Sequence, residues 1–133
     1  MKLLRFSSYL FIILIASLIT ACSGNTESAS MDKQLRHIVL FKFKETTTPA
    51  QIKEIEDAFA ALPAKIREIK GFEWGLNNSP ETFDKGFTHG YILTFDSEED
   101  RAIYLPHPDH QAFGELVGPQ LEDLHVIDFW NQP

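Results

Sequence analysis

Large apolar residues alternate with other residues in two segments of the chain, which is the pattern of β-strands. The first segment, "LRHIVLFKF" at 35–43, carries apolar groups on both strand faces, so we expect both faces to be covered. The second, "GFTHGYILTFD" at 86–96, has large residues on one face and mostly small ones on the other, where we expect a helix to lie close. The large residues are Phe87, His89, Tyr91, Leu93 and Phe95.

Helical periodicity and capping residues predict helices between the strands. Thr48 is a cap, with Pro49 at the first helical position and a glutamine at the capping-box position. A second helical region starts at the serine cap Ser97, stops at Pro106 and starts again at Pro108. The apolar stripe of the first helix comprises Ile52, Ile55, Phe59 and Leu62.

Two further strands are predicted in "GFEWGL", from Gly71, and in "LHVIDFW", near the end of the chain. The order is then strand, helix, strand, strand, helix, strand, with the second helical region split in two. This order predicts an α+β, ferredoxin-like fold, a four-stranded antiparallel sheet with helices on one face. The other sheet face also carries large apolar groups, so we expect a second copy to cover it, sheet to sheet, in a homodimer.

The N-terminus has the three-part pattern of a secretory signal peptide. Lys2 and Arg5 precede an apolar run, and small residues follow the run. The run is shorter than the roughly 20 apolar residues that span a bilayer as a helix. We therefore predict a signal peptide at 1–21 in an exported protein.

Cys22 is the single cysteine of the chain, so it has no partner for an internal disulfide. The residues "ITAC" that end at Cys22 resemble the lipobox of bacterial lipoproteins. This resemblance implies cleavage before Cys22, its modification with acyl chains such as palmitate, and anchoring to the cell envelope membrane. Ser23 after the cysteine implies the outer membrane, periplasmic side, if the cell has one. The alternative is an ordinary signal peptide with a chance cysteine.

The composition of the rest of the chain indicates a flexible tether followed by one acidic domain. Residues 22–34 are small and polar, as in a flexible tether, and one small domain follows at 35–133. The formal net charge is −7, and loss of Lys2 and Arg5 with the signal makes the mature chain more acidic. Nucleic acid is therefore excluded as an expected partner. No Gly-rich phosphate loop, Walker motif or Cys-x-x-Cys is present, and we predict no cofactor.

Four segments together resemble the stress-responsive dimeric α/β-barrel (Dabb) family: "RHIVLFKFK", "THGYILTF", "YLPHPDHQAFG" and "IDFW". The resemblance implies a ferredoxin-like protomer whose sheet meets that of a second protomer to form a barrel. Some plant members cyclise polyketides with a tyrosine and a histidine that face a pocket between sheet and helices. Carried over by motif position, these residues are Tyr104 and His110.

The stretch "YLPHPDHQAFG" (104–114) places its two histidines differently. His107 precedes a proline and should lie near the helix cap, whereas His110 should lie in the first helical turn. The helix dipole there disfavours an imidazolium, so we expect His110 to be neutral and able to accept a proton, with Tyr104 donating to an oxyanion. The alternative is that His110 only fixes the helix start. A metal site of His107 and His110 with Asp109, or with strand histidines, is incomplete, and we predict no metal.

Four further residues are pocket candidates: His37, His89, Tyr91 and Phe113. We predict that the domain binds a small apolar molecule between sheet and helices without chemistry. The alternative, which the sequence leaves open, is a cofactor-independent cyclase, lyase or isomerase with His110 as base and Tyr104 as acid or oxyanion donor. A closed pocket that both side chains enter favours the enzyme, whereas an interior filled by Phe113, Tyr91 and Trp74 favours the binding module.

Overall fold

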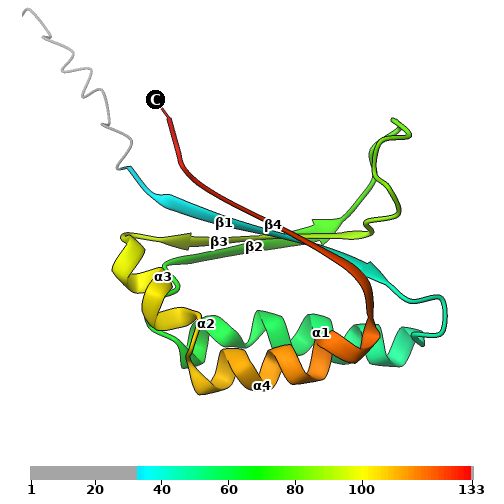
Figure 1. Ribbon diagram of the computed structural model, residues 1–133, viewed down its shortest axis with the longest axis horizontal. Helices are drawn as coiled ribbons and strands as arrows, with labels where there is room; N and C mark the ends of the chain where they lie inside the picture. The colour runs from blue at the N-terminus through cyan, green and yellow to red at the C-terminus, as the bar shows by residue number, and fades with distance from the viewer. Residues whose placement is uncertain (1–32, 133) are drawn as a thin grey trace, which may run out of the picture. The chain divides into compact units, whose positions relative to one another are not determined.

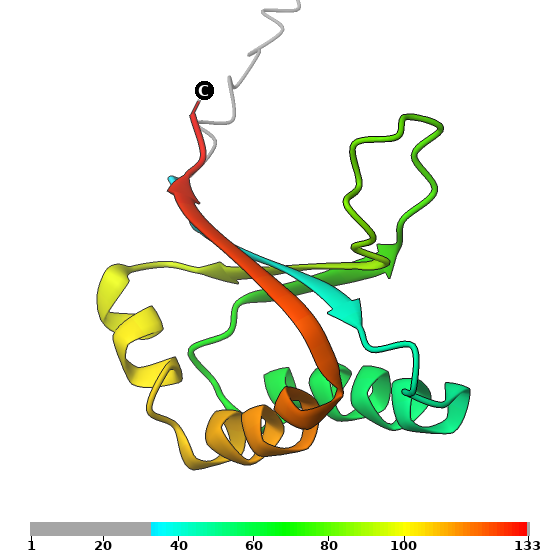
Figure 2. The same ribbon diagram turned by 45° about the vertical axis from the view of Figure 1, so that its right-hand side comes forward.

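The computed structural model describes residues 33–132, and their four strands form one antiparallel sheet in the order β2-β3-β1-β4. Helices α1 to α4 lie on one side of this sheet (Figure 1; Figure 2). The predicted ferredoxin-like α+β fold is confirmed. The elements are β1 (Leu35–Phe43), α1 (Pro49–Ala60), α2 (Leu62–Lys65), β2 (Gly71–Leu76), β3 (His89–Phe95), α3 (Glu98–Tyr104), α4 (Pro108–Val117), the 3-10 turn η1 (Gly118–Gln120) and β4 (Leu121–Trp130).

The predictions for the N-terminus concern residues that the structure does not describe. The predicted signal peptide at 1–21, Cys22 and most of the predicted tether at 22–34 lie outside the described residues. Within residues 33–132, no helix is both long and apolar enough to cross a membrane.

Side-chain caps fix where the helices begin. The Thr48 hydroxyl accepts a hydrogen bond from the Gln51 backbone N–H at 3.3 Å, and the Gln51 side chain accepts one from the Thr48 N–H at 2.9 Å. This is the predicted capping box. Ser97 caps α3 by accepting from the Asp100 N–H at 3.0 Å.

The helices cover the sheet face that carries the large side chains. Tyr91 on β3 is fully buried, and its ring centroid lies 4.5 Å from that of Phe59 on α1. The expectation that a helix packs on the face with the small residues of β3 was wrong. Burying aromatic and branched side chains stabilises the fold by roughly 1.5–3 kcal/mol each, which outweighs the closer approach that glycine permits at Gly90.

Within residues 33–132, no helix lies on the opposite sheet face, and apolar side chains are exposed there. Ile127 and Phe129 on β4 are each about half exposed. Ile127 pairs in register with Ile38 of β1, so the apolar surface continues across neighbouring strands. The β2–β3 connection at 77–88 rises on this same side (Figure 1).

Candidate functional site

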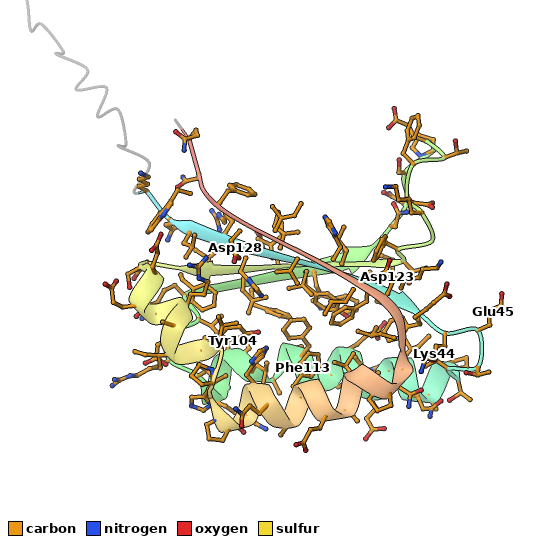
Figure 3. All side chains as sticks on the ribbon, viewed as in Figure 1. Lys44, Glu45, Tyr104, Phe113, Asp123 and Asp128 are labelled. Carbon is orange, nitrogen blue, oxygen red and sulfur yellow. The ribbon has the colours of Figure 1, made fainter. Side chains whose placement is uncertain are left out.

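Tyr104 and His110 come from the corner between α3 and α4. Tyr104 is the last residue of α3, and α4 begins at Pro108 after a short turn. His107 caps α4, because its Nδ1 accepts a hydrogen bond from the Asp109 backbone N–H at 3.2 Å. His110 lies in the first turn of that helix, as predicted from Pro108. Figure 3 shows Tyr104 and Phe113 between the sheet and the helices.

The rings of Tyr104 and His110 are in direct contact, with centroids 4.2 Å apart and planes inclined by 39°. His110 Nδ1 lies 2.9 Å from the Leu105 carbonyl oxygen. A carbonyl oxygen can only accept, so Nδ1 is the donor and carries the proton. In the neutral ring, Nε2 is then the free acceptor.

The hydroxyl of Tyr104 is suited to donating a hydrogen bond. The residue is only 1% exposed. Burial raises the pKa of Tyr104 well above its ordinary value, because the phenolate would lose its hydration. The phenol therefore stays protonated at neutral pH, beside a histidine nitrogen that is able to accept a proton.

Both side chains line a cavity of about 480 Å³ between α4 and strands β1 and β4. Its polar residues are at the α3–α4 corner and on the adjoining strands, and most of the remaining wall is apolar. The polar side chains are His37, Tyr104, His110 and Asp128, and the apolar ones include Val39, Phe41, Phe59, Phe113, Val117, Leu121, Leu124 and Val126.

His37 and Asp128 form a hydrogen-bonded pair in the cavity wall. His37 Nδ1 lies 2.6 Å from one carboxylate oxygen of Asp128, and Arg101 Nη1 lies 3.0 Å from the other. The His37 ring meets Tyr104 edge-on, with centroids 5.8 Å apart. His37 is the one strand histidine that the fold brings to this cavity.

His89 and Tyr91 do not line this cavity, although both were pocket candidates. Both lie on β3, whereas the cavity lies under β1 and β4. Tyr91 is packed in the aromatic core, and its buried hydroxyl has no hydrogen-bond partner among the described residues. His89 is instead a buried, hydrogen-bonded histidine: Nε2 lies 3.2 Å from Glu56 and Nδ1 lies 2.8 Å from the Thr88 hydroxyl.

Trp74 also lies outside the cavity, where it stacks on Tyr91. Of the three residues expected to fill a collapsed interior, Phe113 alone reaches the wall of the cavity. The interior is therefore open beside Tyr104 and His110.

Arg101 and Asp128 were not singled out from the sequence. Asp128 stands among apolar residues in the last strand, which is the signal that could have revealed it, since a carboxylate there needs a partner. Arg101 gave no such signal, because an arginine on a short helix is ordinarily a solvent-exposed residue.

The described residues contain no cluster of three or more histidine, cysteine or acidic side chains able to hold a metal ion. His107 Nδ1 already accepts the bond that caps α4. The lone pair that a metal would need at this nitrogen is therefore in use.

A second hollow, of about 780 Å³, lies on the helix-free side of the sheet. The 77–88 connection forms one wall, and the sheet forms the other. Its lining includes Leu40, Leu76, Phe83, Phe87, His89 and His125.

Comparison with known proteins shows to which family this chain belongs. The model of the stress responsive A/B barrel domain, Dabb, matches residues 35–131. The chain belongs to the Dabb family. The match takes in every described strand and helix, so the cavity with Tyr104 and His110 lies within the Dabb domain.

Proteins similar to this Dabb chain include two that are named as enzymes. Olivetolic acid cyclase of Cannabis sativa is 30% identical over 95 residues, which cover 71% of this chain and 94% of that protein. Hydroxynitrile lyase from Passiflora edulis has a similar structure, with a TM-score of 0.71 and 28% identity over 76% of this chain and 95% of that one.

A third similar protein is described as a dimer. It is a dimeric ferredoxin-like protein of unknown function from Thermobifida fusca, with a TM-score of 0.64 and 29% identity over 74% of this chain and 92% of that one. Binding and catalysis are thus both compatible with a Dabb domain, and a dimer is the assembly described for this structural relative.

Proposed function

We propose that this domain binds a small, mainly apolar molecule in the cavity beside Tyr104 and His110. The observation that carries the proposal is the open cavity of about 480 Å³ with aromatic and aliphatic walls and a few convergent polar groups. This combination is typical of small-molecule sites. The apolar wall supplies affinity through burial, and the polar end orients the ligand.

Filling the cavity tests this proposal. Gly114 lies on α4 in the cavity wall, and a Cβ added there meets no atom within 4 Å. Gly114→Leu should therefore fold and occupy the space of the ligand. Glu115→Leu, which adds the same side chain at an exposed position of the same helix, is the matched control.

We expect 4-butylbenzamide, a neutral apolar probe, to bind the wild type and Glu115→Leu with similar affinity. We expect Gly114→Leu to lose roughly tenfold or more, because a displaced aromatic ring forfeits one to several kcal/mol of burial. Isothermal titration calorimetry measures the affinities. Equal binding by all three proteins would place the probe elsewhere and contradict the proposal.

Catalysis without a cofactor is the second candidate. It is favoured by the contact of Tyr104 with His110, whose Nε2 is the free acceptor of the neutral ring. His110 would take a proton from an acidic O–H or C–H bond of the ligand. The Tyr104 hydroxyl would donate a hydrogen bond to the oxygen on which negative charge develops. The enzyme names of two similar proteins add support.

We further infer that two copies of the domain pair through the helix-free sheet face. The exposed apolar residues on β4 and the description of a structural relative as dimeric support this assembly. Sheets that pack face to face lie about 10 Å apart, which removes such side chains from water.

We also propose that the protein is exported and lipid-anchored through Cys22. The support is the signal-like N-terminus and the "ITAC" sequence that ends at this cysteine. In a bacterial host given labelled palmitate, the wild type should carry the label and sediment with membranes, whereas Cys22→Ser should carry none. Equal labelling of both proteins, or an unlabelled wild type, would refute acylation at Cys22.

A further inference from the structure

Three charged or ionisable side chains from three elements meet at the polar end of the cavity. Asp128 on β4 lies between His37 on β1 and Arg101 on α3. Its carboxylate lies 2.6 Å from His37 Nδ1 and 3.0 Å from Arg101 Nη1, through different oxygens. The His37 side chain is almost fully buried, whereas those of Asp128 and Arg101 are about one-quarter to one-third exposed.

The bond to Asp128 determines how His37 can act. A carboxylate accepts, so His37 Nδ1 donates and Nε2 is the nitrogen that remains for a ligand. When Nε2 takes up a proton, the imidazolium keeps its bond to the carboxylate and gains a charge partner. His37 can thus change from acceptor to charged donor without moving.

Arg101 offsets the charge of Asp128. Without the guanidinium, the carboxylate would repel an anion placed beside His37. With it, the Arg101–Asp128 pair is neutral, and a protonated His37 makes the cluster positive. The other ionisable groups near His37 are the Tyr104 phenol and, in contact with Tyr104, His110. The β3 residues beside it, Leu93 and Phe95, are apolar.

We propose that the ligand of this cavity is an apolar weak acid, a carboxylic acid or a phenol, whose anionic oxygen is bound by protonated His37 Nε2 and the Tyr104 hydroxyl. This inference rests on the proposed binding function and names its ligand class. Arg101 is a positioning residue that acts through Asp128. Binding of the anion takes up one proton, which His37 holds.

Two probes of the same shape test the ligand class, 4-butylbenzoate and its neutral amide, 4-butylbenzamide. The acid is ionised at pH 7, because carboxylic acids have pKa values of about 4. We expect the wild type to prefer the benzoate by about tenfold or more, the size of a charge-assisted hydrogen bond. Calorimetry in phosphate and in Tris separates proton uptake from binding, because the two buffers release a proton with different enthalpies.

Variants assign the roles. Arg101→Gln should lose the preference for benzoate and keep its affinity for the amide. Arg67→Gln is the matched control: it removes an arginine that is paired with Glu68 and is outside the cavity lining, and it should keep the preference. His37→Gln and Asp128→Asn should both bind benzoate without proton uptake. Circular dichroism establishes that each variant is folded.

The outcomes separate this inference from the proposed function. Equal affinity of the wild type for acid and amide would overturn the ligand class and leave cavity binding intact. Binding of neither probe would overturn both proposals. A preference that survives Arg101→Gln would refute the positioning role, and proton uptake that survives His37→Gln would place the proton on another group.

Discussion

Ile127→Asp should convert the protein from a dimer into a monomer. Ile127 is 46% exposed on the helix-free sheet face, where we infer that the second copy packs. A carboxylate there would lose its hydration in the apolar interface. An unpaired buried charge costs several kcal/mol, so we expect the dimer dissociation constant to rise by about a thousandfold or more.

Ile103→Asp is the control for this prediction. Ile103 on α3 has nearly the same exposure, 48%, but it lies on the helix side of the fold. Size-exclusion chromatography with light scattering should give a dimer for the wild type and for Ile103→Asp, and a monomer for Ile127→Asp. A dimeric Ile127→Asp protein would show that the copies meet through another surface.

If the cavity is catalytic, His110→Ala should lower turnover by about 10²–10⁴-fold, the usual contribution of a general base. Mandelonitrile is a suitable probe, because one of the similar structures is a hydroxynitrile lyase. His110 Nε2 would take the hydroxyl proton, the C–C bond to the nitrile carbon would break, and benzaldehyde and cyanide would form. Benzaldehyde release is followed by its absorbance.

Two variants accompany this measurement. Tyr104→Phe should also lower turnover, because removing one donor to a developing oxyanion costs about 10²–10³-fold. His107→Asn should keep wild-type turnover, since asparagine is a good helix cap and His107 does not line the cavity. Unchanged turnover in His110→Ala would show that His110 is not the general base. If the wild type neither cleaves mandelonitrile nor exchanges the C2 proton of benzoylacetone in D₂O, binding without catalysis is the better account.

Local signals in the sequence predicted the elements well. The capping box at Thr48 and the cap at His107 are short-range features, so residues only two or three positions away determine them. The alternation in 35–43 and 86–96 predicted β1 and β3 for the same reason. Tyr104 and His110 lie six residues apart, and the family resemblance was enough to pair them.

The long-range contacts of the site could not be predicted from the sequence. Asp128 reaches His37 because β4 pairs with β1, and that strand order joins residues 91 positions apart. The separation of His89 from the cavity has the same origin, since β3 lies on the other side of β1. Packing also decides which face of β3 meets the helices. Burying the large side chains of Tyr91 and its neighbours stabilises the fold more than a close approach of a helix to the small residues would.

The polar groups of the cavity belong to two parts of the fold, and the hydrogen bond from His110 Nδ1 to the Leu105 carbonyl holds the His110 ring to one of them, the α3–α4 corner. It ties the imidazole to the same corner that carries Tyr104, so these two groups move together if the corner shifts. His37 and Asp128 belong instead to the sheet. Phe113 lines the apolar wall of the cavity and packs on Phe41 of β1, so a substitution there would change the size of molecule admitted, while the spacing of Tyr104 and His110 stays constant. Among related domains, the size of the bound molecule could therefore change while the Tyr104–His110 pair stays the same.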